Sequence, residues 1–138
     1  MVLQVLITGS REATKPMLEK ACEVVKWAKS EGHSVIVGDA LGIDRIVRMW
    51  CIAKKVPVTV YGAYGKIRDE DLGRKPDGTQ TEQRIITHGT YPERDCVMAE
   101  ECDICVAIWN SRSRGTKITF DAAKKLGKTV YLRTFEKQ

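Results

Sequence analysis

The stretch Val106–Gly127, VAIWNSRSRGTKITFDAAKKLG, carries a strand, a loop and a helix in direct succession. Its apolar start, Val106–Trp109, is typical of a strand that is buried on both faces of a sheet. Polar and cationic residues follow, and the pattern from Thr116 to Leu126 is helical until Gly127 ends it. A plain turn needs only about two to four residues and no cations. The loop therefore predicts a site that holds an anion.

The same succession of strand, loop and helix continues along the rest of the chain. Five apolar segments are predicted to be strands, namely Val2–Ile7, Ser34–Val37, Pro57–Tyr61, Asp103–Trp109 and Thr129–Leu132. The helices predicted between them run from Thr14 to Gly32, across Ile46–Ala53, over Tyr91–Glu101 and over Thr116–Leu126. The alternation predicts an α/β fold, in which residues 1–138 form a single Rossmann-like three-layer domain with a mainly parallel five-stranded sheet.

The segment Gly62–Gly89 departs from this pattern. Gly, Asp, Lys and Thr dominate it, and its apolar residues show little periodicity. A long excursion inside a compact domain is usually a functional lid or a disordered segment. We therefore expect a loop-rich insertion at about residues 62–89, which would act as a mobile cover.

The charge and hydropathy of the chain narrow its partners. The net charge of +5 favours anionic partners, although it does not distinguish a nucleotide from a nucleic acid. No apolar run approaches the roughly 20 residues of a membrane span. The start, MVLQVLITGSRE, lacks the basic leader and cleavage site of a signal peptide. We therefore expect a cytoplasmic protein without a membrane partner.

The five cysteines agree with that location, because their number is odd and thiols stay reduced in a cytoplasm. Cys102 and Cys105 have CxxC spacing, but only His33 and His88 are left to complete a zinc site. We interpret Cys102 and Cys105 as packing residues, and we expect no metal and no cofactor.

Glycine-bearing loops follow three of the predicted strands. Because the strands are parallel, these loops open on one edge of the sheet, where ligands bind at the switch in strand order. Thr8–Arg11 and Ser113–Thr116 combine glycine, hydroxyl groups and arginine before a helix, a composition that suits phosphate although neither is a standard fingerprint. In Gly38–Asp44, Asp39 or Asp44 would accept hydrogen bonds from a ribose, or Asp44 would cap the next helix.

Four motifs in order resemble the SLOG superfamily, a Rossmann-like group that includes the DNA-processing protein DprA and the Lonely Guy phosphoribohydrolases. They are Ile7–Arg11, Gly38–Asp44, Arg94–Met98 and Ala107–Thr116, and the small stand-alone YspA-like branch is the most similar. The resemblance implies a nucleotide pocket, with phosphate on the loop before Thr116. The predicted ligand-binding residues are Gly9, Ser10, Arg11, Gly38, Asp39, Arg94, Asn110, Ser113, Arg114, Gly115 and Thr116.

The same resemblance argues against the best-known reaction of the group. Lonely Guy enzymes carry GGxGTxxE, whose glutamate helps to cleave an N-glycosidic bond. Aligned on Gly115 and Thr116, that position is Thr119, and a hydroxyl is no substitute for a carboxylate base near neutral pH. The sequence therefore favours binding over catalysis, with Glu12 as the candidate for a relocated carboxylate.

Three functions stay open at this point. The first is binding of a nucleotide or nucleotide-derived phosphorylated ligand by a sensor or carrier, with charge from Arg11, Arg94, Arg112 and Arg114. The second is a nucleotide N-glycosidase or phosphoribohydrolase with a relocated carboxylate, and the third is DprA-like binding of single-stranded DNA. A homodimer or higher homo-oligomer is also open.

The tryptophans are expected either to contact the ligand or to pack in the core. Trp109 ends its strand and would either stack on a base or pack in the core. Trp27 and Trp50 lie at helical core spacing, so both are predicted to be packing residues.

Overall fold

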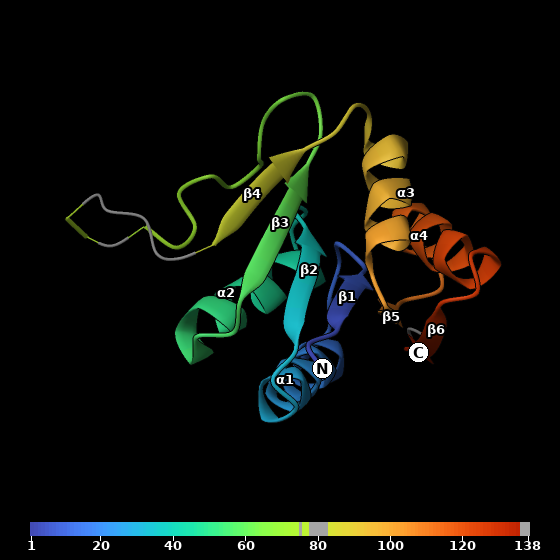
Figure 1. Cartoon of the computed structure of the whole chain (residues 1–138), viewed down its shortest axis with the longest axis horizontal. Helices are drawn as coiled ribbons and strands as arrows, with labels where there is room; N and C mark the ends of the chain where they lie inside the picture. The colour runs from blue at the N-terminus through green and yellow to red at the C-terminus, as the bar shows by residue number, and fades with distance from the viewer. Residues whose placement is uncertain (75, 78–82, 136–138) are drawn as a thin grey trace.

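The computed structural model describes residues 1–74, 76–77 and 83–135 (Figure 1). Their strands are β1 (Gln4–Gly9), β2 (Ser34–Gly38), β3 (Val58–Gly62), β4 (Arg84–Thr87), β5 (Ile104–Trp109) and β6 (Thr129–Thr134). Their helices are α1 (Lys15–Ser30), α2 (Ile43–Lys54), α3 (Tyr91–Glu101) and α4 (Arg114–Lys125).

The six described strands form one parallel sheet in the order β4-β3-β2-β1-β5-β6. The chain winds outward from β1 to β4, then crosses back and adds β5 and β6 on the other side of β1. The winding direction therefore reverses between β1 and β5, which pair from Val5 opposite Ile104 to Gly9 opposite Ile108. The predicted three-layer α/β fold with a parallel sheet is confirmed, and the reversal creates a crevice position at the carboxyl ends of β1 and β5.

The sheet has one strand more than the five predicted. The additional strand, β4, lies inside the segment predicted to be loop-rich and pairs with β3, from Thr59 opposite Arg84 to Gly62 opposite Thr87. It has only four residues, of which three are exposed, because it forms an edge of the sheet. An exposed edge strand needs no apolar run, so hydrophobic patterning could not reveal it.

The helices cover the sheet on both faces (Figure 1). Helices α1 and α2 pack on one face against Val5 and Ile7 of β1, whereas α3 and α4 pack on the other face, where Leu6 points. Alternate residues of each central strand thus enter opposite cores, which explains why these strands are apolar throughout. No helix in the described ranges is long and apolar enough to cross a membrane.

One of the two tryptophans predicted to pack in the core differs from expectation. Trp27 is 39% exposed and lies beside the ring of His33, with the ring centroids 5.4 Å apart, so the prediction that it packs in the core is wrong. It falls next to the buried stripe of α1, which consists of Met17, Ala21, Val24, Val25 and Ala28. Trp50 is partly buried against the core between α1, α2 and the sheet.

Three of the five cysteines lie where packing residues would, whereas Cys22 is half-buried and Cys96 is exposed. Cys51 is buried between α2 and the sheet, while Cys102 and Cys105 are buried beneath α3 and α4. Burial raises the pKa of the Cys51 and Cys105 thiols to about 12, so these groups stay protonated. Over the described ranges, no three side chains of the metal-ligating types come together as a metal site would require.

Candidate functional site

Ser10 joins the strands and helix that meet at the β1–β5 reversal. Its backbone N–H donates to the carbonyl of Ile108 at 3.2 Å, and its carbonyl accepts from the N–H of Ile43 at 3.2 Å. Its Oγ accepts from the backbone N–H of Asn110 at 2.9 Å. The side chain is fully buried, so Ser10 acts as a joint between β1, β5 and α2, beneath the surface that a ligand would reach.

Gly9 and Gly38, two of the three glycines predicted to line the site, leave no room for a side chain. A Cβ atom on Gly9 would lie 2.4 Å from Cβ of Ile43, so a side chain there would displace the start of α2. A Cβ atom on Gly38 would lie 2.6 Å from Oδ2 of Asp44. Both glycines allow close internal packing, whereas the neighbouring Arg11 is exposed at the same edge of the sheet.

The loop from Asn110 to Thr116 is shaped by its own side chains. Oδ1 of Asn110 accepts the backbone N–H groups of Arg112 at 2.9 Å and Ser113 at 3.0 Å. Oγ of Ser113 caps α4 by accepting the N–H of Thr116 at 3.4 Å, and the two hydroxyls lie 3.0 Å apart. The indole N–H of Trp109 donates to the carbonyl of Ser113 at 2.8 Å. These residues preorganise the loop, and the half-buried Trp109 belongs to it.

The surface of this loop is cationic and open. Arg112, Arg114 and Gly115 are exposed, and Arg114 and Gly115 are the first two residues of α4. Among the residues that the structure describes, a Cβ atom on Gly115 would have Oδ2 of Asp95, at 3.9 Å, as its only neighbour within contact range outside the local chain. Backbone N–H groups in the first turn of a helix carry partial positive charge and point away from the helix. The start of α4 therefore suits an anion.

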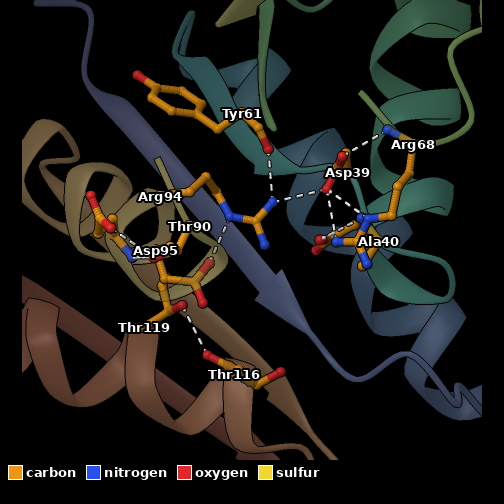
Figure 2. Close-up of polar contacts among 12 residues, drawn as sticks. Asp39, Ala40, Tyr61, Arg68, Thr90, Arg94, Asp95, Thr116 and Thr119 are labelled. Carbon is orange, nitrogen blue, oxygen red and sulfur yellow. Dashed lines mark hydrogen bonds and ion pairs between the residues drawn. The ribbon is translucent and has the colours of Figure 1, made fainter. Parts of the chain in front are cut away.

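Arg94 occupies a different environment, between two carboxylates (Figure 2). Its Nη1 lies 2.9 Å from Oδ1 of Asp39 and donates to the carbonyl of Tyr61 at 2.8 Å. Its Nε lies 2.8 Å from Oδ1 of Asp95. The guanidinium group is buried, so its charge is compensated inside the protein. The sequence placed Arg94 and Asp39 in one pocket, and the structure joins them as an ion pair.

Asp39 is held mainly by the insertion. It accepts the backbone N–H of Arg68 at 2.8 Å and also pairs with the guanidinium group of Arg68, whose Nη2 lies 2.8 Å away. Burial by itself would raise the pKa of Asp39, but the hydrogen bonds and charge of Arg68, together with Arg94, hold it below its usual value. Asp39 is thus an ionised anchor for the insertion and for α3.

Asp44 is the buried carboxyl group in this region whose bonding is incomplete. Its Oδ2 accepts the N–H of Ala40 at 3.2 Å, whereas its buried Oδ1 has no partner among the residues that the structure describes. Burial raises the pKa of Asp44 to about 7, against the opposing effect of Arg94. The N-cap of α2 is Gly42, so Asp44 lies in the first turn and does not cap the helix.

A second arginine fastens the insertion to α2. Arg48 is buried, and its guanidinium group donates to Oε1 of Gln83 at 2.7 Å and to the carbonyls of Asp69 at 3.1 Å and Leu72 at 3.2 Å. The exposed Arg45 pairs with Asp69 at 3.2 Å. Asp69, Leu72 and Gln83 of the insertion are therefore anchored to α2. Residues 75 and 78–82 of the expected mobile cover lie outside the described ranges.

Asp95 is a site residue that the sequence did not single out. It is buried between Arg94 and α4, where the hydroxyl of Thr119 contacts its carboxyl group and also donates to the carbonyl of Gly115 at 2.9 Å. Burial raises the pKa of Asp95, and Arg94 and Thr119 oppose this shift. Glu12, the carboxylate favoured by the sequence, is exposed. The sequence places Asp95 in the Arg94–Met98 motif and among several available carboxylates, of which Glu12 is the one it favours.

These elements define a Rossmann-like α/β protein whose strand-order reversal carries a cationic, preorganised loop. No model of a known protein family matches the chain, and comparison with curated proteins finds no significant match. Solved structures do match it. DNA processing protein A (DprA) from Streptococcus pneumoniae has a TM-score of 0.77 and 20% identity, over 95% of this chain and 50% of that chain.

Two further structures extend this comparison. DNA processing protein A from Helicobacter pylori, described with its single-stranded DNA binding mode, has a TM-score of 0.73 and 16% identity, over 94% of this chain and 64% of that one. A molybdenum cofactor binding protein from Rippkaea orientalis has a TM-score of 0.71 and 18% identity, over 98% of this chain and 78% of that one.

The chain therefore has the fold that these proteins share, as the resemblance of its motifs to a group that includes DprA predicts. It spans only 50% and 64% of the two DprA chains. The predictions of a cytoplasmic location and of a homo-oligomer stay predictions.

Proposed function

We propose that the protein binds a nucleotide or nucleotide-derived phosphorylated ligand, with phosphate at the start of α4. The observation that carries this proposal is the open first turn of that helix. Arg114 and Gly115 are exposed, and a Cβ atom on Gly115 would meet only Asp95 within contact range among the described residues outside the local chain. Phosphate binds at such helix starts because unpaired N–H groups and the helix dipole both favour an anion.

The distribution of charge supports this position. Arg11, Arg112 and Arg114 are exposed at the carboxyl ends of β1 and β5, and the chain carries a net charge of +5. Exposed guanidinium groups keep their forked donors available for phosphate oxygens. Buried Arg94 and Asp39 contribute indirectly, because they fix α3 and the insertion beside the site.

The structural neighbours allow either a small molecule or a nucleic acid as the ligand. The Rippkaea orientalis protein binds the molybdenum cofactor, and the Helicobacter pylori protein binds single-stranded DNA. We favour a small phosphorylated molecule because the open site is a single helix start with a short cationic loop. Binding of DNA would engage several phosphates, so its affinity would depend steeply on salt and on oligonucleotide length.

A thermal-shift panel tests this proposal. It contains nucleoside mono- and diphosphates, ADP-ribose, cyclic nucleotides, the corresponding nucleosides and single-stranded oligonucleotides of increasing length. A ligand that binds only the folded state stabilises it by about 2.7 kcal/mol at a concentration 100 times its Kd, which raises the melting temperature. We expect a rise with one class of phosphorylated small molecule and none with its nucleoside. The absence of any rise with a phosphorylated compound would contradict the proposal.

The buried Asp95 supports a second candidate, hydrolysis of an N-glycosidic bond in the bound nucleotide. Its carboxyl group lies beneath the first turn of α4 and has a raised pKa, as a general acid and base requires. Water would add its hydroxyl group to C1′ while the base leaves, and Asp95 would pass the remaining proton of that water to the departing base.

The matched variants Asp95→Asn and Glu12→Gln test this second candidate with nucleoside monophosphates as substrates. We expect base release by the native protein and by Glu12→Gln, and its loss in Asp95→Asn. If the native protein releases no base from AMP, GMP, CMP or UMP, hydrolysis is excluded, whereas the proposal of ligand binding is unaffected.

A further inference from the structure

Two tyrosines lie at the same edge of the sheet as the start of α4. Tyr64 follows the end of β3, and Tyr91 is the first residue of α3. Their rings meet edge to face, with centroids 5.4 Å apart and planes at 77°. In this arrangement, one ring fixes the other without covering both of its faces.

Tyr91 is the fixed member of this pair. The guanidinium carbon of Arg68 lies 4.2 Å from its ring centroid, and that of Arg94 lies 5.1 Å away. Both arginines are themselves held by Asp39. Tyr91 is therefore supported by the buried ion-pair network.

Tyr64 is the presented member. Its side chain is 63% exposed, and its backbone has a φ of +56°, a left-handed conformation that is unusual for a bulky residue. The conformation is held by its N–H, which donates to the carbonyl of Gly89 at 2.7 Å, and by the turn between Ala63 and Lys66. The chain thus keeps an unfavourable backbone conformation at Tyr64 while its aromatic ring lies in solvent. Burial of the ring does not explain this conformation.

Arg94 and Asp95 lie between this ring pair and the proposed phosphate site along a series of contacts. The ring of Tyr91 contacts Arg94, whose Nε lies 2.8 Å from Asp95. Oδ2 of Asp95 in turn lies 3.9 Å from the position of a Cβ atom on Gly115. The tyrosine pair and the start of α4 therefore both lie next to the Arg94–Asp95 pair. Figure 2 shows Asp95 between Arg94 and Thr119 of α4, with the guanidinium group of Arg94 directed toward Asp39 and Tyr61.

We infer that Tyr64 is the stacking surface for a planar aromatic ring of the ligand, whose phosphate lies at the start of α4. The inference rests on the proposed function and narrows its ligand class to phosphorylated compounds that carry an aromatic heterocycle, such as nucleotides. A sugar phosphate would use only half of this site. Stacking tolerates any base, because every base has a π-face.

Calorimetric titration with AMP, adenosine and ribose 5-phosphate tests the inference. The native protein is compared with Tyr64→Leu, with Tyr64→Phe, which keeps the ring, and with Tyr131→Leu. Tyr131 is a matched control on β6, since it is 59% exposed. Loss of one base–aromatic stack is expected to weaken AMP binding by roughly 5- to 100-fold in Tyr64→Leu. Tyr64→Phe and Tyr131→Leu should keep native affinity, and ribose 5-phosphate should bind all four proteins equally.

The possible results separate the two proposals. If ribose 5-phosphate binds as tightly as AMP, or if Tyr64→Leu binds AMP like the native protein, the stacking inference is overturned while the phosphate site stands. If adenosine binds as tightly as AMP and Tyr64→Leu still loses both, the stacking surface stands and the phosphate site fails. Binding of none of the three probes overturns both.

NMR of the native protein supplies a second test that does not depend on the folding of a variant. AMP should shift the ring resonances of Tyr64, and ribose 5-phosphate should leave them unchanged. Equal shifts with both compounds would overturn the stacking inference.

Discussion

Arginines mark two regions at the carboxyl edge of the sheet, but their environments are opposite. In the loop before α4, Arg112 and Arg114 are exposed. Beside the end of β2, Arg94 is buried between Asp39 and Asp95. A buried guanidinium group is tolerated only with its carboxylate partners, whereas an exposed one keeps its donors for a ligand. This difference supports the proposal that the first region binds the ligand and the second holds the surrounding elements in place.

The largest effect is expected at Arg94. The change Arg94→Ala leaves Asp95 buried without its ion-pair partner and Asp39 paired with Arg68 alone, which should lower the free energy of unfolding by about 3–5 kcal/mol. The exposed control Arg114→Ala should change it by no more than about 0.5 kcal/mol. Urea denaturation measures both, and equal losses in the two variants would erase the distinction between the regions.

The pH dependence of stability should come next, through Asp44. Its pKa of about 7 in the folded protein lies above the ordinary value of 3.8. Between pH 3.8 and about 7, the folded protein therefore keeps the proton of Asp44, whereas the unfolded chain has lost it. This contribution is fully present below pH 3.8 and is lost as the pH rises toward 7. Asp44→Asn should therefore gain stability over the native protein across that range, by about 4 kcal/mol at its plateau.

Unfolding free energies at pH 5, 6, 7 and 8 measure this difference. The variant Asp121→Asn, at an exposed position on α4, is the control and should follow the native protein at every pH. A constant difference between Asp44→Asn and the native protein over this range would show that Asp44 does not change its protonation there.

A smaller effect is expected at the helix cap in the exposed loop. Ser113→Ala removes the oxygen that accepts the N–H of Thr116, which should cost about 1 kcal/mol. Thr14 is the N-cap residue of α1 but makes no side-chain cap hydrogen bond, so Thr14→Ala should cost much less. Thermal denaturation of both variants compares the caps, and a larger loss in Thr14→Ala would contradict this account of the loop.

Hydrophobic patterning predicted the layers of the fold because every strand that is covered on both faces must be apolar. It missed β4, whose residues are mostly exposed, and it misplaced Trp27, which lies beside the buried stripe of α1. Motif order brought Asp39 and Arg94 to one place, although they are 55 residues apart. The orientation of each side chain could not be predicted from the sequence, since composition does not show whether an arginine faces a ligand or a buried carboxylate.

The most direct test of the central claim removes charge at one end of α4 and compares it with the other end. Arg112→Ala/Arg114→Ala and Lys124→Ala/Lys125→Ala lose the same net charge, from exposed residues at opposite ends of the helix. In calorimetric titrations with the phosphorylated ligand that gives the largest thermal shift, the arginine pair should lose about 2–4 kcal/mol of binding free energy and the lysine pair should stay close to native. Equal affinities of the two double variants would contradict a phosphate site at the start of α4.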